Sequence, residues 1–398
     1  MDKQKQAPLA QRSLERLHFN HKDMDYYLSW IIGRNVFEGS QPEECMATAA
    51  RIQDGDPVSW QREWEALARR VEEEANSAFE LGEREAARGA YLRACTYYRA
   101  PLFIMDPGDS RFRENRRKMQ DCFRNAMRLF EFPIDAIQVP YQGSMLEGYT
   151  WKVDQSAGKL PTLLVVGGIE TFAEDCFFMV GTAPLERGYN VVTVDLPGQG
   201  INPEKGLFLQ ARMGLPVKAV IDHVLDFPEV DQSRLALFGF SWGGHIVLQG
   251  AQDETRLKAL IANPPMPDVF RAARAQQSGN GRGDPVARQV FAQIAWRFGA
   301  KIKWELKPIL KRFGMAYDYF AHGKADCKRI TCATLCMAGA GEAPITHEMA
   351  QKCFAELPHP QKKLVILTRE EGGEAHCQVN NLPLLNRVIF DWLEQVSR

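Results

Sequence analysis

The chain has 398 residues, a length that suits two domains and an ample apolar core. Its formal net charge of −1 gives no electrostatic reason to expect a nucleic-acid partner or a charged membrane surface. No apolar stretch has the length that spans a bilayer, and the polar start, residues 1–6, leads to no run of signal-peptide length. We therefore expect a cytoplasmic protein.

The cysteines do not indicate a metal or disulfide framework. They are nine, an odd number, and they are scattered through expected helices and strands, which favours reduced thiols. The closest pair, Cys332 and Cys336, lies in an expected strand with no histidine nearby, so we expect no zinc site.

The chain before about residue 135 has a helical pattern. We expect helices at 60–81 and 83–98, with Gly82 as the break between them. Four residues of the second helix recur at helical spacing: Ala87, Tyr91, Ala94 and Tyr98. We interpret their shared face as packing between helices rather than as a ligand surface.

Phe132 and Pro133 end the helical part. Two segments after them predict an antiparallel hairpin, at 134–139 and 145–153. We therefore predict a helical domain, residues 1–133, and a second domain, residues 134–398. A homodimer through the helical domain is one arrangement that the sequence allows.

The most informative stretch is 235–244, where a short apolar strand runs directly into Gly-x-Ser-x-Gly. This pattern predicts a strained strand-to-helix turn that raises the hydroxyl of Ser241 above the end of a sheet. We expect Gly239 and Gly243 to be needed because a side chain there would collide with a neighbouring strand or helix. Ser241 is therefore the candidate nucleophile.

A serine nucleophile needs a histidine to take its proton and a carboxylate to orient that histidine. His376 is the histidine that follows an expected strand, 363–368, and precedes a closing helix, 384–396. It therefore stands where this type of site presents its base, after the serine and the acid.

The carboxylate should follow the strand before that one, 331–338, and Glu342 stands in the loop there. Two alternatives remain open. Asp268 follows an earlier expected strand, and Asp326 precedes the strand 331–338.

Backbone amides must also bind the negative oxygen of the intermediate. Trp242 supplies one because it directly follows the serine, and we expect the second from Gly168 or Ile169. These two residues lie in Gly-Gly-Ile-Glu, directly after the apolar strand 163–166. A later strand ends in Asp-x-Pro-Gly-x-Gly, and we interpret its Asp195 as structural.

An insertion at about 269–325 separates the elbow from the last strands. It begins with a flexible linker, 276–285, and continues with expected helices at 286–298 and 304–313 that carry several aromatic residues. We predict a cap that covers the serine, excludes water and favours a bulky, flat or apolar substrate.

These motifs resemble the α/β-hydrolases with an N-terminal helical domain, a group that includes 2,6-dihydroxypseudooxynicotine hydrolase and hydrolases that shorten polyketides in fungal pigment pathways. The resemblance rests on four segments: 91–99, 167–170, 239–245 and 375–381 followed by 390–393. It implies an α/β fold, with a mostly parallel sheet covered by helices on both faces.

The same resemblance implies hydrolysis of a carbon–carbon bond beside a ketone, or of an ester-like bond, in an aromatic or polyketide-derived small molecule. It implies no metal and no organic cofactor. It also places Glu170 near the substrate carbonyl, although Glu170 could instead cap the helix after it. The sequence departs from the group at the acid, because the relatives mostly carry Asp where Glu342 stands.

Two other classes of function stay open. The same site could perform acyl transfer, lactonisation or elimination, and hydrolase folds also serve as ligand receptors. The presence of Ser241, His376 and a plausible acid favours an enzyme over a receptor. Cys377, beside the histidine, is expected to be a packing residue.

Overall fold

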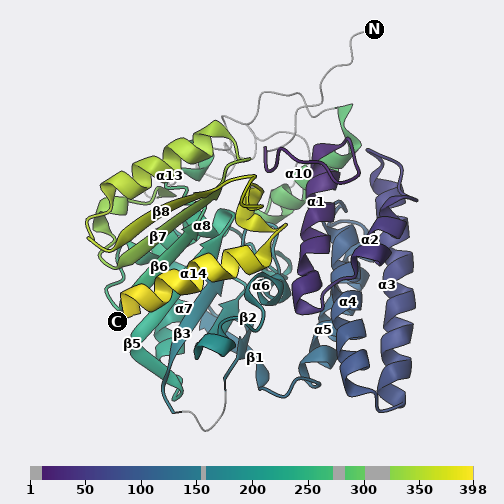
Figure 1. Ribbon diagram of the computed structural model, residues 1–398, viewed down its shortest axis with the longest axis horizontal. Coiled ribbons are helices and arrows are strands. Elements are labelled where there is room, and N and C mark those ends of the chain that lie inside the picture. The colour runs from purple at the N-terminus through teal and green to yellow at the C-terminus, as the bar shows by residue number, and fades with distance from the viewer. Residues whose placement is uncertain (1–10, 154–157, 272–282, 301–322, 398) are drawn as a thin grey trace.

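The computed structural model describes residues 11–153, 158–271, 283–300 and 323–397. Within these residues, eight strands form one sheet in the order β1-β2-β4-β3-β5-β6-β7-β8 (Figure 1). β1 and β2 form the predicted antiparallel hairpin, and β2 is also antiparallel to β4. The other neighbouring strands are parallel. The predicted α/β architecture with a mostly parallel sheet is therefore confirmed.

The strands are β1 (Ile134–Tyr141), β2 (Ser144–Trp151), β3 (Leu160–Val166), β4 (Asn190–Val194), β5 (Val230–Phe240), β6 (Leu257–Asn263), β7 (Ala333–Gly339) and β8 (Lys362–Leu367). The helices that accompany the sheet are α6 (Ala173–Val180), α7 (Gly214–Leu225), α8 (Trp242–Ala251), α10 (Pro285–Arg297), α13 (Pro344–Glu356) and α14 (Leu382–Ser397).

Five α-helices precede the sheet in the described chain: α1 (Lys22–Gly33), α2 (Pro42–Ala49), α3 (Pro57–Glu80), α4 (Arg84–Leu102) and α5 (Ser110–Met127). The two predicted helices correspond to α3 and α4. α3 begins earlier than predicted because the Asp56 carboxylate accepts hydrogen bonds from the amides of Val58 and Ser59, and Pro57 occupies the first helical position.

The face of α4 that the sequence singled out is packed between helices, as predicted. Its four residues, Ala87, Tyr91, Ala94 and Tyr98, are at most 4% exposed. The Tyr91 hydroxyl donates to Asn76 Oδ1 at 2.7 Å, and the Tyr98 hydroxyl donates to Glu72 Oε2 at 2.6 Å. Both partners belong to α3, so these tyrosines join the two helices.

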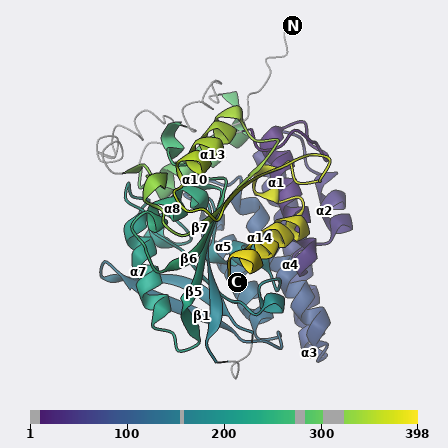
Figure 2. The same cartoon turned by 60° about the vertical axis from the view of Figure 1, so that its left-hand side comes forward.

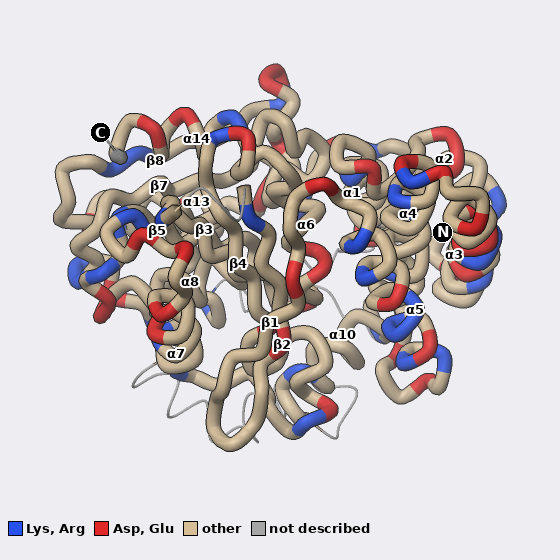
Figure 3. The backbone as a smooth tube through the Cα atoms, turned by 90° about the horizontal axis from the view of Figure 1, so that it is seen from below, with Lys and Arg blue, Asp and Glu red and all other residues tan. Residues whose placement is uncertain are grey.

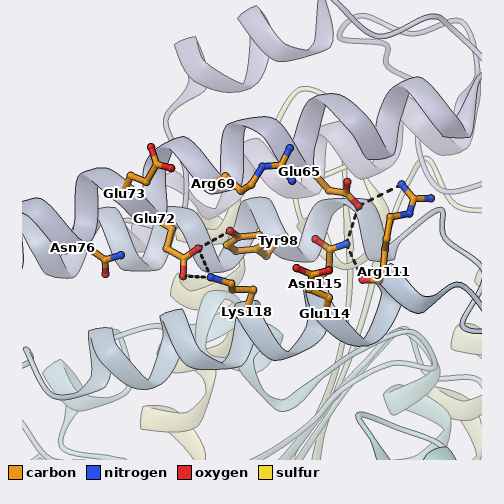
Figure 4. Close-up of a pocket in the computed structure, with 10 residues that line it drawn as sticks. All are labelled: Glu65, Arg69, Glu72, Glu73, Asn76, Tyr98, Arg111, Glu114, Asn115 and Lys118. Atoms are coloured by element: carbon orange, nitrogen blue, oxygen red, sulfur yellow. Dashed lines mark hydrogen bonds and ion pairs between the residues drawn. The ribbon is translucent and has the colours of Figure 1, made fainter.

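A polar cleft of about 440 Å³ lies between α3, α4 and α5 (Figure 4). Several of its polar groups bind one another: Lys118 Nζ contacts Glu72 at 2.8 Å, and the Asn115 amide donates to Glu65 at 2.8 Å. Both basic and acidic residues lie along α3 and α5 in the tube view (Figure 3). Ion pairs and hydrogen bonds between side chains of neighbouring helices therefore account for the polar residues named here.

Alternate side chains of the strands supply two cores. One core holds side chains such as Leu164 and Leu237 with α7, α8 and α13. The other holds side chains such as Leu163 and Phe238 with α6, α14 and the N-terminal helices. Figure 2 shows the sheet nearly edge-on, with α7 and α8 on one side and α14 and the N-terminal helices on the other. The N-terminal helices thus share a core with one face of the sheet.

Part of the predicted cap is described. The helix expected at 286–298 is α10, whose N-cap is Asp284. Asp284 also contacts His21 Nε2 at 3.0 Å, and Trp296 packs edge-on against Phe112 of α5 at 5.5 Å between ring centroids. α10 is therefore attached to the N-terminal helices. The helix predicted at 304–313 lies outside the described residues, and the cap boundaries stay a prediction.

Among the helices that the structure describes, none is both long and apolar enough to cross a membrane.

Candidate active site

The chain turns sharply at Ser241, between β5 and α8. Ser241 has φ 57° and ψ −128°, in the left-handed region that residues with a side chain rarely adopt. A Cβ on Gly239 would lie 2.2 Å from the Gly243 carbonyl oxygen, and a Cβ on Gly243 would lie 2.4 Å from the Val166 oxygen. The prediction of a strained turn that needs both glycines is confirmed.

The structure joins Ser241, His376 and Glu342 in one chain of hydrogen bonds. His376 Nδ1 lies 2.9 Å from Glu342 Oε2, and His376 Nε2 lies 2.9 Å from Ser241 Oγ. Because an ionised carboxylate only accepts, Nδ1 carries the hydrogen and Nε2 is free to accept from the serine hydroxyl. Glu342 is 4% exposed, and its second oxygen accepts from the Gly339 amide at 3.1 Å. Both carboxylate oxygens are therefore fixed.

The two alternative acids are engaged elsewhere. Asp268 contacts Lys324 Nζ at 2.8 Å and accepts from the Arg271 amide at 3.0 Å. Asp326 accepts from the Lys328 amide at 3.1 Å. Of the three candidates, Glu342 is the one that the described structure places against the histidine.

Residues 11–14, which we call the N-terminal arm, hold the loops that carry the acid and the histidine. The His376 amide donates to the Arg12 carbonyl at 2.7 Å, and the Gln11 side chain donates to the Gly341 carbonyl at 3.1 Å. Ser13 Oγ and the Leu14 amide both donate to the carboxylate of Glu374, at 2.5 and 3.0 Å. Sequence analysis missed this arm.

Tyr26 and Tyr27, at the start of α1, extend the contacts of the arm toward the site. The Tyr26 hydroxyl donates to the His376 carbonyl at 3.4 Å, and the Arg12 guanidinium lies 4.1 Å from the Tyr26 ring centroid. The Tyr27 hydroxyl donates to Glu170 Oε1 at 2.7 Å. The helical part of the chain therefore forms one wall of the candidate site.

The structure tests one of the two interpretations of Glu170, namely that it caps the helix after it. Helix α6 begins after Phe172, whose amide donates to the Asp175 carboxylate at 3.0 Å. The carboxylate that caps this helix is thus Asp175, and the capping interpretation of Glu170 is wrong. A position near the substrate carbonyl stays a prediction.

The segment expected to supply the second oxyanion amide lies directly beside the nucleophile. A Cβ built on Gly168 would be 2.8 Å from Ser241 Cβ. Gln199 Nε2 donates to the carbonyls of Gly167 and Gly168, at 2.6 and 3.0 Å, so the carbonyls of this segment are held in one direction. Because the carbonyls already accept from Gln199, the amides of Gly168 and Ile169 remain the candidate donors to the oxyanion.

Trp242 is the first residue of α8, where a backbone amide has no partner within the helix. The sequence predicts that this amide binds the oxyanion. At the first position of the helix it is not used by a hydrogen bond within the helix. Asp195, interpreted as structural, is buried against Gly200, on which a Cβ would overlap the Asp195 carboxylate. Its place under this tight turn agrees with that interpretation.

Cys377 lies beneath the nucleophile. It is 1% exposed, its φ is 58°, and its Sγ accepts from the Ser241 amide at 3.1 Å. Burial raises the pKa of this thiol, so the group stays protonated and unreactive. The expected packing role agrees with this position. Over the described ranges, no cluster of three or more His, Cys, Asp or Glu side chains is arranged to hold a metal ion.

The charges around His376 predict the pH range in which it stops acting as a base. Burial would lower the pKa of His376, but the negative charge of the Glu342 carboxylate raises it, and the net direction is upward from 6.5. Only the neutral ring can take the serine proton. The rate at which a fluorophosphonate labels the enzyme should therefore fall as pH drops, with its midpoint above pH 6.5. A midpoint at or below pH 6.5 would contradict this.

Comparisons with known proteins place this chain in a family. The sequence matches the FrsA-like esterases over residues 8–278. Hydrolase LUC6 of Fusarium sp. is 29% identical over 404 residues, covering 92% of this chain and 94% of LUC6. The 20-hydroxy-prefusarin hydrolase FUS2 of Gibberella moniliformis is 30% identical over 402 residues, covering 92% of this chain and 94% of FUS2.

A solved structure has the same fold. The 2,6-dihydroxy-pseudo-oxynicotine hydrolase superposes with a TM-score of 0.71 at 20% identity, over 92% of this chain and 95% of that one. The turn at the serine, the mixed sheet and the family match agree with one another. The chain therefore belongs to the FrsA-like esterase family of α/β-hydrolases.

Proposed function

We propose that this protein is a serine hydrolase in which Ser241 is the nucleophile, His376 the general base and Glu342 the acid that orients it. The observation that carries the proposal is the hydrogen-bond chain from Ser241 Oγ through both ring nitrogens of His376 to Glu342. A receptor has no need of a serine hydroxyl that is raised by a strained turn and hydrogen-bonded to a partly buried imidazole.

In the proposed reaction, Ser241 Oγ attacks the substrate carbonyl carbon while His376 Nε2 takes the hydroxyl proton. The amides of Trp242 and of Gly168 or Ile169 bind the oxyanion. His376 then protonates the leaving group, and the carbonyl carbon stays bound to Ser241 as an ester. Water, deprotonated by His376, attacks that ester and releases the carboxylic acid and the free serine.

The proposed substrate is an aromatic or polyketide-type small molecule with an ester or a ketone beside the cleaved bond. Two relatives in fold or sequence carry names that specify small-molecule substrates, 20-hydroxy-prefusarin and 2,6-dihydroxy-pseudo-oxynicotine. Aromatic rings also gather around the elbow: Trp242 lies 6.1 Å from Phe270 and 6.0 Å from Phe298, between ring centroids. Cleavage of a carbon–carbon bond further requires a leaving carbanion that a ring or a ketone can stabilise.

The proposal is tested by intact-protein mass spectrometry after treatment with a fluorophosphonate probe. The wild type should gain one adduct, and Ser241→Ala should gain none, because the hydroxyl that attacks phosphorus is missing. Ser233→Ala is the matched control, since Ser233 is exposed and lies in β5, the strand that leads into Ser241. It should label at the wild-type rate. An unlabelled wild type, or a labelled Ser241→Ala, would overturn the proposal.

A further inference from the structure

Three arginines are buried around the segment that follows β3. Arg34, Arg99 and Arg297 are 1%, 1% and 0% exposed, and they come from the turn directly after α1, from α4 and from α10. Burying a guanidinium is costly unless it is paired and hydrogen-bonded. Such a concentration of buried charge from three distant parts of the chain therefore calls for a structural or functional reason.

One carboxylate pairs with two of these cations. Asp175 accepts from Arg34 at 2.5 Å and from Arg99 Nε at 3.0 Å. Arg297 has no ion pair among the described residues, and its side chain donates instead to backbone carbonyls. Burial and then the neighbouring charge of Arg99 lower the pKa of Arg297 to about 10, so it still carries its charge at neutral pH.

Two guanidinium groups meet at one carbonyl oxygen. Arg99 and Arg297 each donate to the Glu170 carbonyl, both at 2.9 Å. The other terminal nitrogen of Arg297 donates to the Gly198 carbonyl, also at 2.9 Å. The Glu170 carbonyl closes the segment 167–170, whose Gly168 lies against Ser241. These two side chains thus fix the end of the segment that carries the candidate oxyanion amides.

Neither arginine can act by touching the substrate. A side chain with almost no accessible surface offers nothing for a ligand to contact. Any effect of Arg99 or Arg297 on the reaction must therefore pass through the backbone that they hold. An oxyanion donor has to lie about 2.7–3.1 Å from the developing charge. A displacement of about 1 Å can cost about 100-fold in rate.

We propose that Arg99 and Arg297 are positioning residues that set the oxyanion site by clamping the Glu170 carbonyl. The inference rests on the proposed serine-hydrolase function. One arm of the clamp belongs to the helical domain and the other to the cap helix α10. The oxyanion amides are therefore correctly positioned only when both α4 and α10 are packed against the segment 167–170.

The test uses Arg297→Met, Arg297→Lys and Arg99→Lys in the full-length protein, with p-nitrophenyl acetate for kcat and KM and a fluorophosphonate for the labelling rate. For Arg297→Met, kcat should fall about 100-fold while KM stays within about threefold, because the substrate contacts remain. The kcat of each lysine variant should lie between that of Arg297→Met and that of the wild type. An ammonium keeps the charge, but it lacks the fork that reaches two acceptors at once.

Arg117→Met is the matched control, because Arg117 is 61% exposed and pairs with Asp121 one turn along α5. It should keep wild-type kcat and KM. A purely structural role would lower Tm and leave the kcat of the folded lysine variants unchanged, and that result would overturn the inference. So would a loss confined to KM. If Arg297→Met does not fold, the two lysine variants decide the question.

Failure of this inference and failure of the proposed function give different results. A wild type that takes no fluorophosphonate at Ser241 overturns the proposed function. A wild type that labels, together with folded variants that label at the same rate, overturns the clamp alone.

Discussion

His376→Ala is expected to lower kcat by about 10⁵- to 10⁶-fold for hydrolysis of p-nitrophenyl acetate, with the fold retained. The imidazole is the group within 2.9 Å of both Ser241 Oγ and Glu342, so its removal leaves the serine without a base and the carboxylate without its partner. Turnover is measured at saturating substrate, after Tm has shown that the variant is folded.

His18→Ala is the control for that experiment, because His18 is exposed and packs edge-on against Phe19. Its kcat should equal that of the wild type. If His376→Ala kept more than about one hundredth of the wild-type kcat, another group would have to be the base, and the mechanism proposed above would be wrong.

Glu342→Gln is expected to lower kcat by about 10⁴-fold while it preserves the shape of the site. An amide can place a donor against His376 Nδ1, which moves the ring hydrogen to Nε2, where it can no longer accept from the serine. The lost carboxylate also removes a charge that raises the pKa of His376. The midpoint of the acid limb should therefore move to lower pH in the labelling assay.

Glu348→Gln serves as the matched variant, because Glu348 is exposed on α13 and contacts Arg271 at 3.1 Å. Its rate and its pH profile should be those of the wild type. A Glu342→Gln enzyme that kept kcat within about tenfold of the wild type would return Asp268 and Asp326 to consideration as the acid.

The fold could be predicted because its elements obey local rules. The strands are apolar runs or alternating segments closed by glycine and proline. The turn at Ser241 is recognisable from the glycines two positions before and after it. Helix ends were predicted less well. The early start of α3 was readable from Asp56 and Pro57, a capping residue followed by the proline that favours a first turn.

The geometry of the candidate triad was also foreseeable, since the order of strands fixes which loops meet at the end of a parallel sheet. The N-terminal arm was not foreseeable. The contact with the His376 amide is made by the Arg12 carbonyl and one contact with Glu374 by the Leu14 amide, and backbone groups leave no residue pattern. Arg99 and Arg297 escaped notice for a related reason, because the partner that they share is the carbonyl of Glu170, and any residue type supplies a carbonyl.

The hydrogen bond between Ser13 and Glu374, which we call the clasp, joins two residues that are 361 positions apart in the chain. A ribosome adds the second of them long after it has added the first. A nascent chain stopped before Glu374 would contain Ser241 on its turn but neither its base nor the clasp that seats the base. Contacts of such long range also form slowly, because closing a large loop must precede any gain from the contact. Activity should therefore appear only after Glu374 and His376 have been added and the N-terminal arm has met the loop that carries them.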